Sequence, residues 1–244
     1  MATDPTLERK ILLGGTLATA VAFLFQLIAI CTSQWLVIEI PKPTSFVNKS
    51  GRYLFKSSSG LWRMCRVYLQ GTDNSEVEEC ESHNLFPFEE DIEVNEAIDS
   101  HYLDYRAKEV LQIDYTRTVI AFTIIALVLM CIVHSFAFYT IRRPRYIIKR
   151  LTALLHFMTA ACILVLNEVF VKAVEHEREH LADRFPDGGD SEYGFSFVFS
   201  WLVFIVFVVV GLIFLFVSHK RKADMGEDDD ALAQEDEPMQ LGRV

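Results

Sequence analysis

The sequence predicts an all-α membrane protein, a bundle of four transmembrane helices that carries a small extracellular β-sheet. Of the 244 residues, 51% are hydrophobic, and they are concentrated in four segments instead of being spread along the chain. Each segment is about 20 residues long, the length that an α-helix needs to cross a bilayer. A polar region with two cysteines and several runs of β-forming residues separates the first two segments, and it predicts the sheet.

The four predicted spans are helical, because lipid offers no hydrogen-bond partners to the backbone of an open strand. We interpret the first span as an uncleaved signal anchor, since its apolar run is longer than that of a typical cleaved signal peptide. The spans comprise residues 11–31, 119–138, 151–171 and 198–217.

Basic residues predict the orientation of the chain, because short cytoplasmic loops carry an excess of Lys and Arg. Arg9 and Lys10 precede the first span, and basic clusters follow the second and the fourth. We therefore expect both termini on the cytoplasmic side. The residues of the two clusters are Arg142, Arg143, Arg145, Lys149, Arg150, Lys220, Arg221 and Lys222.

This orientation divides the remaining chain between the two sides of the membrane. The cytoplasmic parts are the N-terminus (1–10), a basic loop (139–150) and the C-terminal tail (218–244). We predict that the acidic tail is disordered, because dense charge and few apolar residues prevent burial. Extracellular loop 1 comprises residues 32–118, and extracellular loop 2 comprises residues 172–197.

Extracellular loop 1 holds two of the five cysteines, Cys65 and Cys80. Disulfides persist in an oxidising compartment, and closing a loop of about 15 residues stabilises it by roughly 3 kcal/mol in the chain-entropy model. Two free thiols or intermolecular bonds are the alternative. Asn48 begins an Asn-Lys-Ser sequon in the same loop and is a candidate glycosylation site.

Three segments of loop 1 have the composition of β-strands. Residues 35–40 are rich in β-formers, residues 60–69 predict a second or third strand, and residues 77–82 predict a strand that pairs with it. A bond between the two cysteines would staple that pair. Helical spacing over residues 95–117 predicts an outer helix that leads into the second span.

Extracellular loop 2 is predicted to begin as a continuation of the third helix. Residues 172–184 extend that helix beyond the membrane, and Pro186 to Gly189 end it. The following residues 192–197, EYGFSF, predict a short aromatic strand that joins the sheet of loop 1 before the fourth helix begins.

A tryptophan just after the first span is followed by a Gly-Leu-Trp motif and then by the two cysteines. These residues are Trp35, Gly60, Leu61, Trp62, Cys65 and Cys80. In a four-span chain with a large first outer loop, this pattern resembles the claudin-like superfamily, and the likeness covers about residues 8–222.

Two stretches are similar to the calcium-channel gamma-subunit branch of that superfamily, which includes stargazin and the transmembrane AMPA-receptor regulatory proteins. The first is GLWRMC at residues 60–65, and the second is a Tyr-Gly-Trp-Ser-Phe-like motif before the fourth span. Phe195 replaces the tryptophan of that motif, and the C-terminus lacks the Ser or Thr used for PDZ anchoring. The second stretch consists of Tyr193, Gly194, Phe195, Ser196 and Phe197.

The resemblance implies a small extracellular sheet, stapled by the disulfide, that stands on the helical bundle. We expect Trp62 to bury its ring against this platform, with a direct binding role as the alternative. The small residues Gly14, Ala18 and Ala22 let helices approach closely, and we expect them to pack within the bundle, with contact to a partner helix as the alternative.

The resemblance also implies a function in the plasma membrane: a non-enzymatic auxiliary subunit that binds a pore-forming ion channel subunit and modulates its gating or trafficking. The partner would be a voltage-gated calcium channel or an ionotropic (AMPA-type) glutamate receptor. A claudin-type junction or adhesion protein, which would form homo-oligomers and a paracellular barrier, is the alternative. An orphan four-span protein of membrane organisation is a third possibility.

Other functional classes have no support in the sequence. The chain has no nucleophile motif, phosphate-binding loop or metal-ligand cluster, so we expect neither enzymatic activity nor a cofactor or metal. The net charge of −10 does not bear on nucleic-acid binding, because the charged segments are distributed over both sides of the membrane. Residues 73–104 hold twelve acidic residues and no Lys or Arg. This acidic run is either simply solvated, or it directs the loop towards a basic surface of a partner and raises the association rate.

Overall fold

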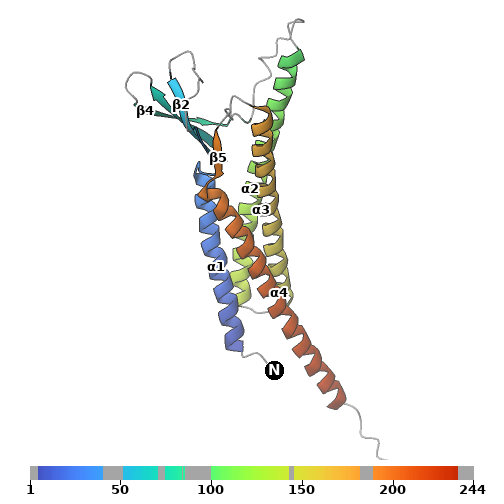
Figure 1. Cartoon of the computed structure of the whole chain (residues 1–244). Helices are drawn as coiled ribbons and strands as arrows, with labels where there is room; N and C mark the ends of the chain where they lie inside the picture. Colours follow the sequence, from blue (N-terminus) through green and yellow to red (C-terminus); the bar gives the residue numbers. More distant parts are fainter. Residues whose placement is uncertain are drawn as a thin grey trace, which may run out of the picture.

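A computed structural model describes most of the chain and shows a helical bundle with a sheet at one end (Figure 1). Within the described residues, the bundle has four helices and the sheet has five antiparallel strands. The predicted fold class is therefore confirmed. The described residues are 5–40, 52–70, 75–83, 85, 100–142, 146–181 and 189–235.

Each of the four helices contains a segment long and apolar enough to cross a membrane. Leucine, isoleucine, valine and phenylalanine make up most of these segments, and many of their side chains face outward, as expected for helices surrounded by lipid. The helices are α1 (Pro5–Cys31), α2 (Ser100–Arg142), α3 (Tyr146–His180) and α4 (Phe195–Glu235).

All four helices extend beyond their predicted spans, and α1 begins at Pro5. The predicted outer helix is confirmed from Ser100 onward and is continuous with the second span in α2. The predicted extension of the third helix is confirmed as far as His180, while the predicted stop at Pro186 lies outside the described residues. Helix α4 continues to Glu235, so the expectation of disorder is not met over residues 218–235. Ala, Leu, Gln, Glu and Lys in this stretch favour helix.

The sheet combines the two loops that the sequence places outside the membrane. Its strands are β1 (Leu36–Glu39), β2 (Arg52–Ser59), β3 (Arg63–Gln70), β4 (Glu76–Ser82) and β5 (Asp190–Tyr193), in the spatial order β4-β3-β2-β1-β5. Strands β1, β3 and β4 confirm the three strands predicted in loop 1. The sequence analysis did not identify β2, whose three consecutive serines lack the composition of a typical strand.

The predicted aromatic strand in loop 2 is only partly correct. Strand β5 pairs with β1, with Leu36 opposite Tyr193, so loop 2 does join the sheet. However, the strand ends at Tyr193, and the two phenylalanines that follow belong to the first turn of α4. Gly194 separates the two elements and changes the direction of the chain.

Apolar side chains inside the bundle form three clusters, and all four helices contribute to each cluster. The cluster nearest the sheet also contains side chains from the α1–β1 corner and from the β2–β3 turn. The other two clusters lie further along the helices, around Ala126 and Met130 and around Ala153 and Phe214. The sheet is therefore attached to the bundle through a shared core.

The small residues of α1 do not all pack within the bundle. Ala22 is buried in the middle cluster, but Gly14 and Ala18 are exposed on the outer face of the helix. A Cβ atom added at Gly14 would meet nothing within 4 Å. The expectation that this ladder packs inside the bundle is therefore wrong for Gly14 and Ala18.

The end of the bundle opposite the sheet holds basic residues of the predicted cytoplasmic clusters. The N-terminus and the far end of α4 both lie at this end (Figure 1). Arg142 and Arg150 are exposed, whereas Lys149 is fully buried and forms an ion pair with Glu8 of α1. Lys220, Arg221 and Lys222 lie on α4 beyond its apolar segment, and Arg143 and Arg145 lie outside the described residues.

Candidate interaction surface and its support

Trp35 lies at the corner between α1 and β1 and joins the sheet to three helices. Its ring is fully buried, and Nε1 donates a hydrogen bond of 2.7 Å to the carbonyl oxygen of Ala29. The ring meets Phe170 of α3 edge-on, with 5.1 Å between centroids, and Phe197 of α4 at 6.1 Å. A large aromatic ring with a satisfied N–H group is well suited to this position.

Two glycines of the family-like motifs enclose the backbone of the same corner. A Cβ atom at Gly60 would lie 2.6 Å from the carbonyl oxygen of Thr32, and one at Gly194 would lie 2.1 Å from that of Gln34. Any side chain at these positions would collide with the main chain, so the close approach requires glycine.

Hydrogen bonds complete this joint. The backbone N–H of Gly194 donates to the carbonyl oxygen of Trp35 at 3.0 Å, and that of Ser196 donates to Gln34 at 3.2 Å. The hydroxyl groups of Thr32 and Ser196 are 2.6 Å apart. The motif residues Trp35, Gly60, Gly194 and Ser196 therefore serve the architecture of the protein.

The tight turn between β2 and β3 contradicts the predicted burial of Trp62. Gly60 donates a backbone hydrogen bond of 2.9 Å to Arg63, which leaves Leu61 and Trp62 at the tip of the turn. Leu61 is only 2% exposed and fills the core below the sheet, whereas Trp62 is 40% exposed. Since Leu61 and Trp35 occupy the space against the bundle, Trp62 is turned outward.

The sheet therefore presents exposed aromatic residues outside the apolar clusters. Phe55, at an irregularity in the pairing of β2 with β3, is 41% exposed, close to the value for Trp62. Exposed aromatic side chains are enriched at protein–protein interfaces. We call Phe55 and Trp62 the aromatic pair. The sequence analysis missed Phe55 because it missed strand β2.

Strand β4 forms an acidic edge of the sheet. Four glutamates project from it, and their side chains are exposed: Glu76, Glu78, Glu79 and Glu81. Charges on an edge strand oppose uncontrolled pairing with other strands, and they also give the surface a negative field that favours a basic partner.

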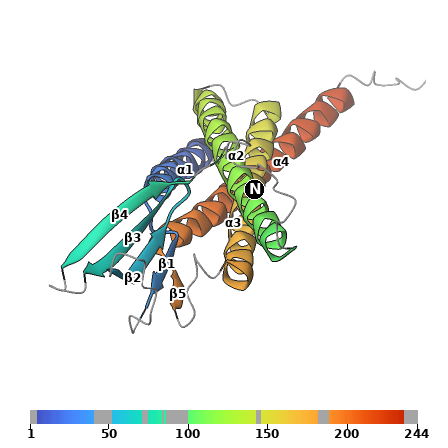
Figure 2. The ribbon, with the colours of Figure 1, turned by 90° about the horizontal axis from the view of Figure 1, so that it is seen from above.

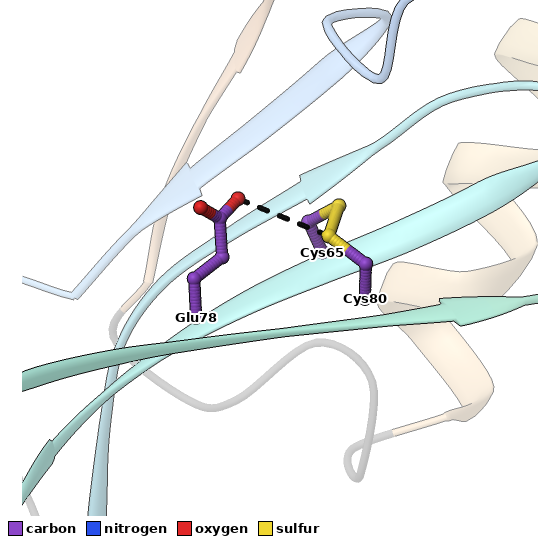
Figure 3. Close-up of side chains that lie close together, drawn as sticks. All are labelled: Cys65, Glu78 and Cys80. Carbon is purple, nitrogen blue, oxygen red and sulfur yellow. Dashed lines mark hydrogen bonds between the residues drawn. A yellow bond between two sulfur atoms is a disulfide. The ribbon is translucent and has the colours of Figure 1, made fainter.

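The two loop cysteines form a disulfide bond across β3 and β4 (Figure 3). This confirms the predicted pairing of these strands and the predicted staple. Figure 3 also shows the carboxylate of Glu78, which lies 3.9 Å from Cys80 Sγ. Among the described residues, these three side chains are the one group with the spacing of metal ligands. Oxidised sulfurs are not thiolates, so the group does not form a thiolate metal site.

Replacing both Cys65 and Cys80 with serine is expected to lower the free energy of unfolding of the sheet by roughly 3 kcal/mol, because the open chain gains loop entropy. The measurement is the rate of proteolytic cleavage within residues 52–82 in detergent at rising temperature. Cys131→Ser, which removes a free and exposed cysteine of α2, is the matched control. Equal cleavage of the double variant and the control would contradict a stabilising role of the disulfide.

Some of the remaining predicted site residues are buried, some are exposed, and one lies outside the described residues. Phe197 is buried beside Trp35, while Tyr193 and Phe195 are exposed near the end of the bundle that carries the sheet. Tyr193 stacks on Phe197 with 4.5 Å between ring centroids. Asn48 lies outside the described residues, so its glycosylation stays a prediction.

Comparison with known proteins gives one family. The family model described as PMP-22/EMP/MP20/Claudin tight junction matches residues 20–216. The matched range begins within α1, includes the whole sheet and ends within α4. No curated protein matches the chain.

Proposed function

The chain is a multi-pass membrane protein that belongs to the PMP-22/EMP/MP20/claudin family, and from this premise we propose that it is a non-enzymatic auxiliary subunit of an ion channel. In this proposal it binds a pore-forming subunit, either a voltage-gated calcium channel or an AMPA-type glutamate receptor. It then modulates the gating or trafficking of that subunit. The protein lies in the plasma membrane, with its sheet outside the cell and both termini in the cytoplasm.

The observation that carries this proposal is the sideways projection of the sheet. Seen from above, the sheet does not cap the bundle but extends away from it, beyond the end of α1 (Figure 2). A membrane protein that packs beside α1 would therefore lie under or against the sheet. This arrangement favours a partner in the same membrane, which the protein contacts both through a helix and through the sheet.

Both parts of that contact have suitable side chains. Gly14 and Ala18 place two small residues on the outer face of α1, which allows a partner helix to approach closely at that point. On the sheet, the aromatic pair supplies exposed apolar area, and the acidic edge of β4 supplies charge. Aromatic side chains contribute much of the energy at protein interfaces, while rim charges mainly raise association rates.

Modulation follows if the protein binds one state of the channel more tightly than another. A differential binding energy of about 1 to 3 kcal/mol shifts a gating or desensitisation equilibrium by roughly 5- to 150-fold. A rigid sheet is suited to this task, because it transmits a contact on its outer face directly to the helices. The shared core around Trp35 supplies that rigidity.

A junctional function is the second candidate, and the description of the matching family, which includes claudin tight junction proteins, favours it. In that function the same exposed sheet would contact another copy of the protein, on the same cell or on the neighbouring cell. The protein would then polymerise at cell contacts when expressed alone.

The decisive experiment is purification of the tagged full-length chain from its native tissue in mild detergent, with bound proteins identified by mass spectrometry. We expect a pore-forming channel subunit in stoichiometric amount. Recovery of only the protein itself and junctional scaffolds would overturn the proposal and favour the junctional function.

A helix variant shows whether α1 provides the contact. Gly14→Leu with Ala18→Leu adds bulk to the outward face of α1 and is expected to reduce recovery of the channel subunit at least fivefold. Val128→Leu, a conservative change at an exposed position of α2, is the control and is expected to leave recovery unchanged. Equal recovery with both variants would exclude this face of α1 from the interface.

A further inference from the structure

The end of the bundle opposite the sheet carries exposed basic side chains on three helices. Figure 1 shows the start of α1, the end of α2 and the start of α3 at this end. Each of these helix ends contributes at least one Lys or Arg whose side chain is exposed. We call these residues the basic rim: Arg9 and Lys10 of α1, Arg142 of α2 and Arg150 of α3.

The described residues do not neutralise the charge of the basic rim. Glu8 is the one acidic side chain that the structure describes at this end, and its carboxylate pairs with Lys149. Because Lys149 is fully buried, this ion pair joins α1 to α3 inside the bundle and leaves the rim on the surface. Within the described part of the chain, no rim residue forms an ion pair.

The basic rim lies at the edge of the apolar surface that faces lipid. About one turn from the rim, on the membrane side, each of the three helices carries an exposed apolar side chain on the same face. In α2 the two groups touch, since the guanidinium carbon of Arg142 lies 4.7 Å from the ring centroid of Phe138. An arginine whose stem follows a lipid-facing ring carries its charge at the level of the lipid head groups. The apolar neighbours, which are 55% to 57% exposed, are Leu13, Phe138 and Leu154.

We propose that the basic rim binds anionic phospholipids through the phosphate groups of their head groups. Three of the four rim residues are arginines, and a guanidinium group binds phosphate oxygens through two parallel hydrogen bonds. In the orientation proposed above, this end faces the cytoplasmic leaflet, which holds the anionic lipids of the plasma membrane. The inference needs helices that lie in a membrane, but it does not depend on the proposed channel partner.

The occupant is an intact lipid and not a soluble phosphate compound. A lipid places its phosphate group beside a rim residue and its acyl chains against the apolar neighbour on the same helix. Arg142 and Phe138 offer both surfaces one turn apart. A soluble phosphate compound makes only the charged contact, which water and salt weaken at an exposed position.

The test is the enrichment of lipids that remain bound to the full-length protein. The protein is reconstituted in vesicles with equal amounts of phosphatidylcholine and phosphatidylserine and extracted in mild detergent, and the retained lipids are quantified. We expect phosphatidylserine to be enriched about threefold or more, because several basic residues attract it together. Higher salt should reduce the enrichment by screening these charges. Equal retention of the two lipids would overturn the proposal.

Paired variants locate the effect. Arg142→Gln with Arg150→Gln is expected to remove most of the enrichment, whereas Arg63→Gln with Arg66→Gln removes the same charge from β3 of the sheet and is expected to leave it unchanged. Arg9→Gln with Lys10→Gln provides a second test if the first rim variant inserts or folds poorly. If neither rim variant lowers the enrichment, the lipid does not bind at the rim, and the proposal fails.

A competition experiment distinguishes an intact lipid from a soluble phosphate compound. Glycerophosphoserine has the head group of phosphatidylserine without its acyl chains. Added during extraction at the concentration of the lipid, it is expected to leave the retained phosphatidylserine unchanged. Displacement of the lipid under these conditions would contradict the assignment of the rim to intact phospholipid.

Discussion

The variant Trp35→Ala is expected to lose about 3 to 5 kcal/mol of unfolding free energy, the range measured when large buried aromatic residues are truncated. The ring of Trp35 is fully buried between Phe170 and Phe197, and its N–H group is bonded to Ala29. Truncation would leave a cavity where the sheet meets the bundle and would remove one of the two side-chain hydrogen bonds that the carbonyl oxygen of Ala29 accepts. Much less folded protein should reach the cell surface.

Trp62→Ala is the matched control for this change, since it removes the same side chain from a position that is 40% exposed. We expect its unfolding free energy to stay within about 0.5 kcal/mol of the wild type, as for most surface substitutions. The measurement is thermal unfolding in detergent together with surface labelling of expressing cells. Equal losses for Trp35→Ala and Trp62→Ala would contradict the assignment of Trp35 to the core and Trp62 to the surface.

If Trp62 belongs to the interface with a channel, Trp62→Ala has a second expected effect. It should reduce recovery of the channel subunit while leaving stability unchanged. Trp62 contributes exposed aromatic area and belongs to none of the three apolar clusters, so the two effects can be separated.

The second large effect is expected for Gly194→Ala. The added methyl group would lie 2.1 Å from the carbonyl oxygen of Gln34, a distance that forces the backbone to move. Strand β5 pairs with β1 through this corner, so the shift would weaken that pairing and lower the free energy of unfolding by about 3 kcal/mol. The measurement is thermal unfolding, followed by the protease sensitivity of residues 189–194.

Gly14→Ala is the control for Gly194→Ala. A methyl group at Gly14 meets nothing within 4 Å, and alanine favours helix over glycine by up to about 1 kcal/mol. The control is therefore expected to be neutral or slightly more stable. If Gly194→Ala behaved like Gly14→Ala, the close approach at the corner would not limit the stability of the protein.

The membrane spans could be predicted from the sequence, because the requirement is local. A helix in lipid must be about 20 residues long and apolar, and each of the four segments meets this condition without reference to the others. The pairing of β3 with β4 was predictable for a similar reason: two nearby cysteines and two β-rich segments share one loop. Strand β2 was missed because Ser57 to Ser59 give no local signal, and its pairing with both neighbours decides its conformation.

The structure of the candidate site depended on distant contacts. Trp62 was predicted to be buried because tryptophan in a strand usually packs. The space against the bundle is instead taken by Leu61 and Trp35, which a single stretch of sequence does not reveal. Lys149 was predicted as a cytoplasmic charge, but its complete burial depends on Glu8, which lies more than a hundred residues earlier.

By itself, then, the sequence determined the four helices, the loops between them and the disulfide-linked strands, since these features follow from length, apolar composition and residues close in the chain. Only the tertiary structure decided which tryptophan supports the fold and which is exposed, and that Gly14 and Ala18 face outward. It also brought Gln112, Thr116 and Glu177 around one cavity. Whether a side chain is buried or lines a cavity depends on which elements pack against it. In this protein those elements come from segments far apart in the chain.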